Sequence, residues 1–273
     1  MIPVPLQETA YAKINLALHV RKRREDGYHE LETLFAFVDA GDSLAVTPAE
    51  RDELLVTGEF ASALDDPFGN IVATALSRLP HGQGWRVRLN KRLPVAAGLG
   101  GGSADAGAVF RMVDAAHGLP DDWRAIAASL GADVPACIDS HACIGRGTGT
   151  DLLPIVNDLS GTAVLLVNPR MPLPTGPVFR AWDGLDRGPM PDGDVRTIAV
   201  AGRNDLEAPA IGLCPAIAEL LAALRETGPW LARMSGSGAT CFALYDTADQ
   251  RAAAAAALAR THPDWWLLEG ALR

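Results

Sequence analysis

Apolar and polar residues alternate along much of the first third of the chain, which is the pattern of strands that bury one face. Residues 9–20 alternate around Ile14 and Leu16, and after a charged turn at 21–27 a second extended run covers residues 31–38. We expect these two runs to pair as antiparallel strands. Further strands are predicted at 42–47, 54–57 and 85–90, and one helix at 70–79.

From residue 103, inside a glycine-rich stretch, helical spacing replaces this alternation. Residues 103–117 place Val109 and Val113 on one helical face, and Gly118 followed by Pro120 ends the predicted helix. The rest of the chain mixes elements of both kinds. We predict a helix at 123–130, a turn between strands at 145–149, strands at 163–167, 240–245 and 265–268, an irregular stretch at 168–193, and helices at 215–226 and 248–260.

This order of elements favours an α+β fold, because strands and helices do not alternate as regularly as they do in a doubly wound sheet. The strand pattern restarts at about residue 162. We therefore expect a domain boundary near Asp158, with an N-terminal domain at 1–158 and a C-terminal domain at 159–273.

Composition and charge narrow the class of protein. The chain has 273 residues, 48% hydrophobic and 21% charged, as expected for one large or two medium globular domains. Its 33 acidic and 24 basic residues give a formal net charge of −9, which argues against nucleic acid as a partner. No basic segment with an apolar core opens the chain, and no apolar run approaches the roughly 18 residues of a membrane span. We expect a soluble, unprocessed protein with no membrane partner.

The four cysteines point to a reducing environment. They show no close paired spacing, so neither a zinc knuckle nor a disulfide framework is predicted. A cytoplasmic location is therefore expected.

Residues 93–105 form the most informative stretch, a glycine-rich loop that runs directly into a helix. Its glycines lack a Cβ, so the backbone can take positive φ angles and approach a ligand closely. Ser103 is a good N-cap, and the turn after it would direct N–H groups and the helix dipole at an anion. The loop matches neither the Walker pattern nor the dinucleotide fingerprint. A flexible turn before a capped helix is the alternative.

A second loop of glycine and serine, at 235–240, lies directly before a predicted strand. By itself it is typical of a tight turn. Together with the first loop it indicates a polyphosphate gripped across a cleft.

Three polar residues are candidates for chemistry. Lys13 and Asn15 lie on one face of a predicted strand, because side chains alternate with period two. A lone lysine there is more often solvated at its tip. Asp133 lies between a helix and an apolar segment, where aspartate commonly binds the N–H groups of a turn.

Six segments, taken in order, resemble the signature of the GHMP kinase superfamily, which is named for galactokinase and for homoserine, mevalonate and phosphomevalonate kinases. Both glycine loops are shared across the superfamily. Lys-x-Asn followed by Asp-Gly-Tyr-His-x-Leu is specific to the branch that phosphorylates a cytidine diphosphate-linked methylerythritol. The resemblance covers almost the whole chain. The segments are 12–16, 26–31, 93–105, 131–135, 204–207 and 235–240.

The resemblance implies a two-lobed GHMP kinase fold, with an N-terminal lobe like domain 2 of ribosomal protein S5 and a ferredoxin-like C-terminal lobe. It implies transfer of phosphate from ATP to the 2-hydroxyl of the methylerythritol in the non-mevalonate isoprenoid pathway. We expect a monomer or a weak homodimer. Asp133 would orient or deprotonate the hydroxyl, and Lys13 would keep that carboxylate ionised and neutralise developing charge.

The resemblance also assigns binding residues. Tyr28 and His29 would meet the cytidine end of the substrate, with Asn15 nearby and Phe179 offering a ring face. The second glycine loop contributes Ser235, Gly236, Ser237 and Gly238. ATP would contact Asn70 at the head of its helix, and Pro94, Val95, Ala96, Ala97, Gly98, Leu99, Gly100, Gly101, Gly102, Ser103 and Ala104.

Mg²⁺ is expected with ATP, because it offsets charge between the β- and γ-phosphate oxygens. Ser103 is its candidate ligand. We expect Asp105 to lie in the first turn of the helix and to interact with the helix dipole there. Two features depart from the commonest family pattern. Val95, Ala96 and Ala97 replace a more glycine-rich start of the loop, and Ala104 stands where a second serine is frequent.

Two alternatives remain at this point. Another GHMP kinase, for a mevalonate-type, homoserine or sugar substrate, would explain both glycine loops but not residues 26–31. A catalytically silent nucleotide-binding protein would have no need of a positioned base such as Asp133.

Overall fold

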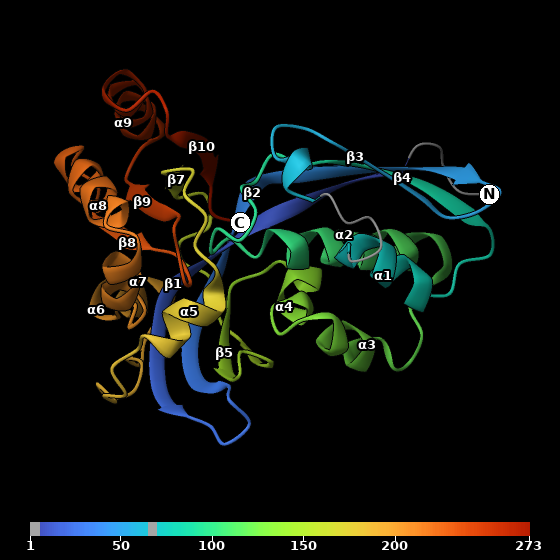
Figure 1. Cartoon of the computed structure of the whole chain (residues 1–273), viewed down its shortest axis with the longest axis horizontal. Helices are drawn as coiled ribbons and strands as arrows, with labels where there is room; N and C mark the ends of the chain where they lie inside the picture. The colour runs from blue at the N-terminus through green and yellow to red at the C-terminus, as the bar shows by residue number, and fades with distance from the viewer. Residues whose placement is uncertain (1–5, 65–69) are drawn as a thin grey trace. The chain divides into compact units, whose positions relative to one another are not determined.

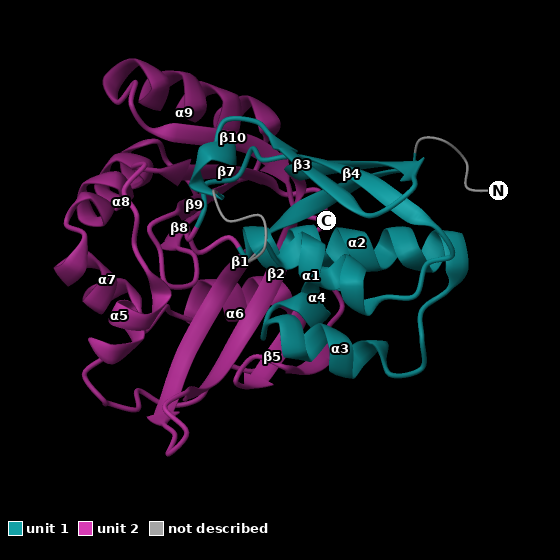
Figure 2. Ribbon diagram, turned by 45° about the vertical axis from the view of Figure 1, so that its right-hand side comes forward, with its two compact units in different colours: residues 1–12, 41–95, 100–140 teal, residues 13–40, 96–99, 141–273 magenta. Residues whose placement is uncertain are grey.

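The computed structural model describes residues 6–64 and 70–273, and these fall into two compact units (Figure 2). Described residues of segments 1–12, 41–95 and 100–140 form unit 1, and segments 13–40, 96–99 and 141–273 form unit 2. The first five residues, on which the expectation of an unprocessed N-terminus bears, lie outside the described residues. The boundary predicted near Asp158 would cut the chain into two continuous segments, whereas each unit is built from several segments. That boundary stays a prediction.

Two long strands, β1 (Leu6–Arg23) and β2 (His29–Ala49), pair with each other (Figure 1), and each contributes residues to both units. The sequence predicted a break in β2 around Gly41, and this was wrong. A Cβ at Gly41 would lie 1.9 Å from the carbonyl oxygen of Ala10, so glycine here permits close backbone approach while the strand continues.

The described residues of unit 1 combine strands with four helices. β4 (Gly84–Asn90) pairs antiparallel with β2 and parallel with β3 (Glu53–Thr57). On β4, Trp85, Val87 and Leu89 are buried and alternate with exposed residues, as the sequence pattern predicted. The helices are α1 (Ile71–Arg78), α2 (Gly101–His117), α3 (Trp123–Leu130) and α4 (Val134–Asp139), and η1 (Ala61–Ala63) is a short 3₁₀ turn.

Small residues let α2 pack closely in unit 1. A Cβ on Gly107 would lie 2.5 Å from the carbonyl oxygen of Cys137, so the backbones of α2 and α4 touch at this point. Because α4 begins just after Asp133, this contact fixes where that residue lies relative to α2.

Unit 2 contains a complete ferredoxin-like arrangement. Its antiparallel sheet has the order β10-β7-β9-β8, and α8 and α9 lie side by side on one face of it (Figure 1). In chain order the strands and these two helices run β-α-β-β-α-β. The predicted α+β class is therefore confirmed. The elements are β7 (Ala163–Asn168), α8 (Ala216–Glu226), β8 (Leu231–Met234), β9 (Cys241–Tyr245), α9 (Ala248–Thr261) and β10 (Trp266–Ala271).

The rest of unit 2 contains the hairpin of β5 (Cys143–Gly147) and β6 (Asp151–Pro154), with β5 antiparallel to β2. Three short helices were missed: α5 (Thr175–Arg180), α6 (Val195–Ala201) and α7 (Glu207–Leu213). α5 interrupts the stretch predicted to be irregular. Six or seven residues give too few turns for helical periodicity to be read, and such helices depend on tertiary packing. No helix among the described residues is long and apolar enough to cross a membrane.

Candidate active site

The first glycine loop reaches its helix through left-handed backbone. Gly98 has φ +77° and Gly100 has φ +60°, a region that glycine tolerates best, and Ala96 adopts φ +52° without that freedom. A Cβ on Gly98 would lie 2.2 Å from the carbonyl oxygen of Ser235, so this position needs glycine for two separate reasons. The loop is thus a strained cradle whose shape depends on missing side chains.

The cap of α2 differs from the prediction. Gly100, not Ser103, is the N-cap residue, and its carbonyl accepts the N–H of Ala104 at 2.7 Å. Gly101 and Gly102 are already helical, which leaves the N–H groups of the first turn without intrahelical acceptors. Ser103 lies within this turn, and its hydroxyl is 3.8 Å from where a Cβ on Gly131 would be. Ser103 therefore faces the segment that leads into Asp133.

Asn70 and Asp133 begin two helices of unit 1. The side-chain oxygen of Asn70 accepts the N–H of Val72 at 2.9 Å, which confirms the predicted position of Asn70 at the head of a helix. Asp133 is the N-cap residue of α4, is half-buried, and makes no side-chain capping bond.

Lys13 and Asn15 share one face of β1, as predicted, and both are buried in unit 2. Lys13 is only 4% exposed, so it is not the solvated lysine that is commonest on strand faces. Its Nζ donates to Asn15 Oδ1 at 2.9 Å, and Asn15 Nδ2 donates to Thr33 Oγ1 at 2.8 Å. The hydroxyl of Thr33 in turn donates to the carbonyl oxygen of Ala17 at 2.7 Å. The ammonium is thereby held by a chain of hydrogen bonds in which Thr33 was missed from sequence.

The second glycine loop contacts part of the first one within unit 2. Ser235 Oγ donates to the carbonyl oxygen of Gly98 at 2.7 Å, and the N–H of Thr240 donates to Ala97 at 3.2 Å. Asn15 joins them, because its N–H donates to Ser235 Oγ at 3.2 Å. Two loops more than a hundred residues apart in sequence are therefore held together with the strand that carries Lys13.

The loop turns at Gly236, with φ +55°, and at Gly238, with φ +84°. The hydroxyl of Ser237 lies 3.0 Å from that of Thr175 at the start of α5. The predicted residues of this loop thus have defined structural partners.

The motif Asn204-Asp205-Leu206-Glu207 supports the second loop from behind. Asn204 Nδ2 donates to the carbonyl oxygens of Met234 and Gly236, each at 2.8 Å. Glu207 accepts the N–H of Met234 at 3.2 Å, and Asp205 accepts the N–H of Val20 at 2.9 Å. These contacts give the motif a scaffolding role.

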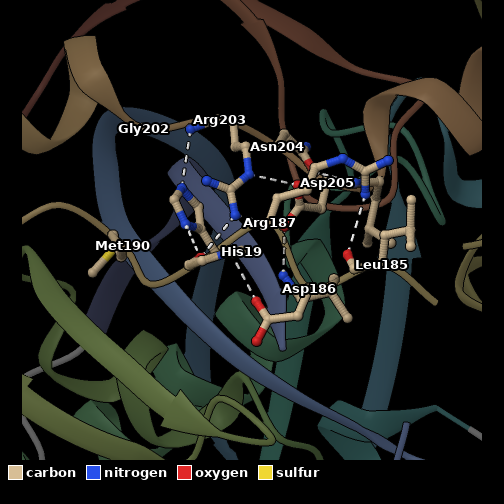
Figure 3. A network of polar contacts seen from close by, with 12 residues as sticks. His19, Leu185, Asp186, Arg187, Met190, Gly202, Arg203, Asn204 and Asp205 are labelled. Atoms are coloured by element: carbon tan, nitrogen blue, oxygen red, sulfur yellow. Dashed lines mark hydrogen bonds and ion pairs between the residues drawn. The ribbon is translucent and has the colours of Figure 1, made fainter. Parts of the chain in front are cut away.

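A polar network surrounds this motif (Figure 3). The N–H of Arg203 donates to His19 Nε2 at 3.2 Å, and His19 Nδ1 lies 3.3 Å from the carbonyl oxygen of Gly188. His19 is therefore the neutral tautomer with hydrogen on Nδ1. Burial, reinforced by the Arg203 charge, lowers the pKa of His19.

An aromatic group lies at the start of β2 in unit 2. The ring centroid of His29 is 5.0 Å from that of Phe179 and 5.7 Å from that of Trp182. The predicted pair of His29 and Phe179 is thus brought together, and Trp182 is an addition that the sequence reasoning missed. Burial and the charge of Arg23 lower the pKa of His29. Tyr28 is 64% exposed in the preceding turn.

The position of Asp105 corrects an expectation. It lies beyond the first turn of α2, is 2% exposed, and accepts a hydrogen bond from Lys91 Nζ on Oδ2 at 2.6 Å. It therefore does not act as a dipole residue facing solvent. No cluster of three or more His, Cys, Asp or Glu side chains suited to a metal occurs in the described part of the chain.

Comparison with known proteins places these features in a family context. The model of the GHMP kinases N-terminal domain matches residues 68–141, and the GHMP kinases C-terminal model matches residues 192–264. The chain is 72% identical over 268 residues to 4-diphosphocytidyl-2-C-methyl-D-erythritol kinase of Novosphingobium aromaticivorans, covering 98% of this chain and 93% of that one. It is 62% identical over 272 residues to the protein of the same name from Erythrobacter litoralis, covering 98% and 100%.

Solved structures agree in fold. A crystal structure of 4-(cytidine 5'-diphospho)-2C-methyl-D-erythritol kinase superposes with a TM-score of 0.82 at 34% identity, covering 98% of this chain and 99% of that one. A homoserine kinase from Cytophaga hutchinsonii gives a TM-score of 0.67 at 15% identity, covering 100% and 96%, and shows likeness of fold alone.

Proposed function

Because the chain belongs to the GHMP kinases, and within them to the 4-diphosphocytidyl-2-C-methyl-D-erythritol kinases, we propose that it phosphorylates the 2-hydroxyl of that cytidylylated methylerythritol with ATP. The products are the 2-phosphate and ADP, and the reaction belongs to the non-mevalonate route to isoprenoids. The observation that carries the proposal is the buried Lys13–Asn15 pair, joined through Ser235 to both glycine loops.

Asp133 acts on the acceptor hydroxyl. It orients the hydroxyl and takes its proton as the oxygen attacks the γ-phosphorus atom. The proposal is supported by the position of Asp133 at the start of α4, the helix that packs against α2.

Lys13 supplies the positive charge for this step. Its ammonium balances the negative charge that develops during transfer. A buried ammonium fixed by Asn15 loses no orientational freedom when the substrate binds, which is the condition for electrostatic preorganisation.

The first glycine loop binds the phosphates of ATP. Its backbone turns through left-handed conformations at Gly98 and Gly100, and the first turn of α2 presents N–H groups to an anion. Asn70 lies on the adenine side. The hydroxyl of Ser103 suits Mg²⁺ as a hard oxygen ligand, and the bound ion would offset charge between the β- and γ-phosphates.

The cytidine end of the acceptor binds at the aromatic group. Phe179 and Trp182 offer ring faces, and His29 and Tyr28 offer polar groups to the base edge. Neutral His29 accepts a hydrogen bond from Arg23 on Nε2 at 3.4 Å, so its Nδ1 carries the hydrogen. The division into lobes at 158/159 and a monomeric or weakly dimeric state belong to the same proposal.

Acceptor choice tests the function. The purified chain is mixed with ATP and Mg²⁺, and ADP release is measured with the cytidylylated methylerythritol, mevalonate, homoserine and galactose in parallel. We expect release with the first acceptor only. Faster release with another acceptor would identify a different GHMP kinase, and ATP binding without release from any of them would identify a silent binding protein.

A double-mutant cycle tests the roles of Lys13 and Asp133. Each of Lys13→Ala and Asp133→Ala should bind ATP with nearly unchanged affinity and turn over very slowly. If both residues act on one reacting hydroxyl, the double variant should be little slower than either single variant. Fully additive losses, or near-normal turnover of Asp133→Ala, would contradict these roles.

A further inference from the structure

A buried charge triad lies beneath the phosphate-binding helix of unit 1. Lys91 follows β4, Asp42 lies on β2, and Asp105 is the fifth residue of α2. Lys91 Nζ lies 2.5 Å from Asp42 Oδ2 and 2.6 Å from Asp105 Oδ2, and all three side chains are at most 2% exposed. The register of β2 on β4, with Ser43 opposite Asn90, brings Asp42 and Lys91 together.

The triad is joined directly to the start of the phosphate loop. Asp42 Oδ1 accepts the N–H of Arg92 at 2.5 Å and that of Leu93 at 2.8 Å. These are the two residues before Pro94, where the loop begins. Asp42 therefore links the loop to Lys91 through one carboxylate.

The triad also reaches the first turn of α2. A Cβ on Gly101 would lie 3.2 Å from Lys91 Nζ and 3.8 Å from Asp42 Oδ2. This explains a glycine whose φ is helical: the ammonium packs directly against the backbone of the turn. Both ends of the anion-binding loop are thus tied to one buried cation.

We propose that the Asp42–Lys91–Asp105 triad positions the phosphate loop. Asp105 holds Lys91 in place. Gly101 and the N–H groups of Arg92 and Leu93 thereby keep the spacing that ATP requires. The proposal rests on the proposed function only for the identity of the phosphate ligand. Asp105 is a positioning residue, because it acts through Lys91.

Charge supports this arrangement. The second oxygen of Asp105, Oδ1, is buried without a hydrogen-bond partner among residues 6–64 and 70–273, a costly position for an ionised carboxylate. Burial, partly offset by Lys91 and reinforced by Asp42, raises the pKa of Asp105 to about 8. Burial lowers the pKa of Lys91, but the Asp105 and Asp42 carboxylates outweigh it, and the pKa lies above its ordinary value. With a pKa of about 8, Asp105 is mostly protonated at neutral pH, so it adds little negative charge beneath the phosphates.

Other ionisable groups on the neighbouring elements point elsewhere. Arg111 on α2 pairs with Glu8, Arg78 on α1 donates to Ser129, and Asp139 on α4 is exposed. Asp42 and Lys91 are therefore the groups whose charge acts on Asp105.

Two variants of nearly equal size separate positioning from simple packing. Asp105→Asn keeps a carbonyl acceptor for Lys91, and Asp105→Leu removes it. Binding of ATP, ADP and adenosine to the full chain is measured by calorimetry, which does not depend on turnover or on the acceptor. We expect Asp105→Leu to weaken ATP and ADP about tenfold, as for one lost charged hydrogen bond, with adenosine unchanged. Asp105→Asn should stay within about twofold of the parent for all three.

The outcomes are distinguishable from failure of the proposed function, since a chain that phosphorylated another acceptor would still bind ATP. Unchanged ATP binding by Asp105→Leu, or equal weakening of ATP and adenosine, would overturn the proposal.

If Asp105→Leu does not fold, pH gives the second measurement. ATP binding to the parent chain should weaken above about pH 8, as Asp105 loses its proton, and should change less in Asp105→Asn. The same pH dependence of ATP binding in both proteins would also overturn the proposed role of Asp105.

Discussion

Replacing Gly98 by alanine should damage the phosphate loop far more than its small size implies. At φ +77° an L-residue costs roughly 1–2 kcal/mol relative to glycine. The new Cβ would also start 2.2 Å from the carbonyl oxygen of Ser235, so the two must separate by about 1 Å or more to reach van der Waals contact.

That displacement acts on the contact between the loops. Ser235 Oγ donates to the carbonyl of residue 98 and Thr240 N–H donates to Ala97, and losing both bonds costs about 1 kcal/mol each. We therefore expect Gly98→Ala to lower the free energy of unfolding by about 3–4 kcal/mol. Because the phosphate cradle moves with the loop, the KM for ATP should rise by at least about tenfold.

Gly228→Ala is the matched control. Its φ is +78°, and no atom lies within 4 Å of the Cβ position, so it carries the backbone cost without the collision. Urea unfolding followed by tryptophan fluorescence gives the stability loss, and initial rates at saturating acceptor give the KM for ATP. Equal stability losses in the two variants, or a parent-like KM for ATP in Gly98→Ala, would refute a collision at this position.

Four further variants are expected to change activity or stability. Asp133→Asn should lower kcat by about 10²–10⁴-fold with little change in the KM for ATP, as steady-state kinetics would show, because it removes the proposed base and keeps the shape. Ala96→Gly should raise the melting temperature, since alanine at φ +52° is strained; an unchanged or lower temperature would exclude strain there. Stability should fall as pH drops below about 6.5, because the lowered pKa of His19 means that the unfolded chain binds the proton first, and neutral His19 accepts from Arg203. Urea midpoints between about pH 5 and 7 should therefore fall less in His19→Gln than in the parent. Phe179→Ala should raise the KM for the acceptor and leave that for ATP unchanged, and a rise for both would remove it from the acceptor site.

Local pattern was enough for several features of the fold. Alternation located β1 and β4, and helical spacing with its glycine stop located α2. Each of these elements is long enough for the spacing of its apolar residues to reveal which face is buried. Short elements such as α5 and α7 carry too little of that period to be read.

The candidate site divides in the same way. Glycine and polar motifs indicated Gly98, Lys13 and the second loop, since each chemistry needs particular residue types in sequence order.

Only the tertiary structure decided how these residues are held. Thr33 fixes Asn15 across paired strands, Gly100 replaces Ser103 as the cap of α2, and Lys91 joins two carboxylates from separate elements. Sequence spacing carries no information on such contacts, because strand register and helix packing bring together residues that lie far apart along the chain. The sequence determined which groups are present, and packing determined which of them are buried, paired and poised to act.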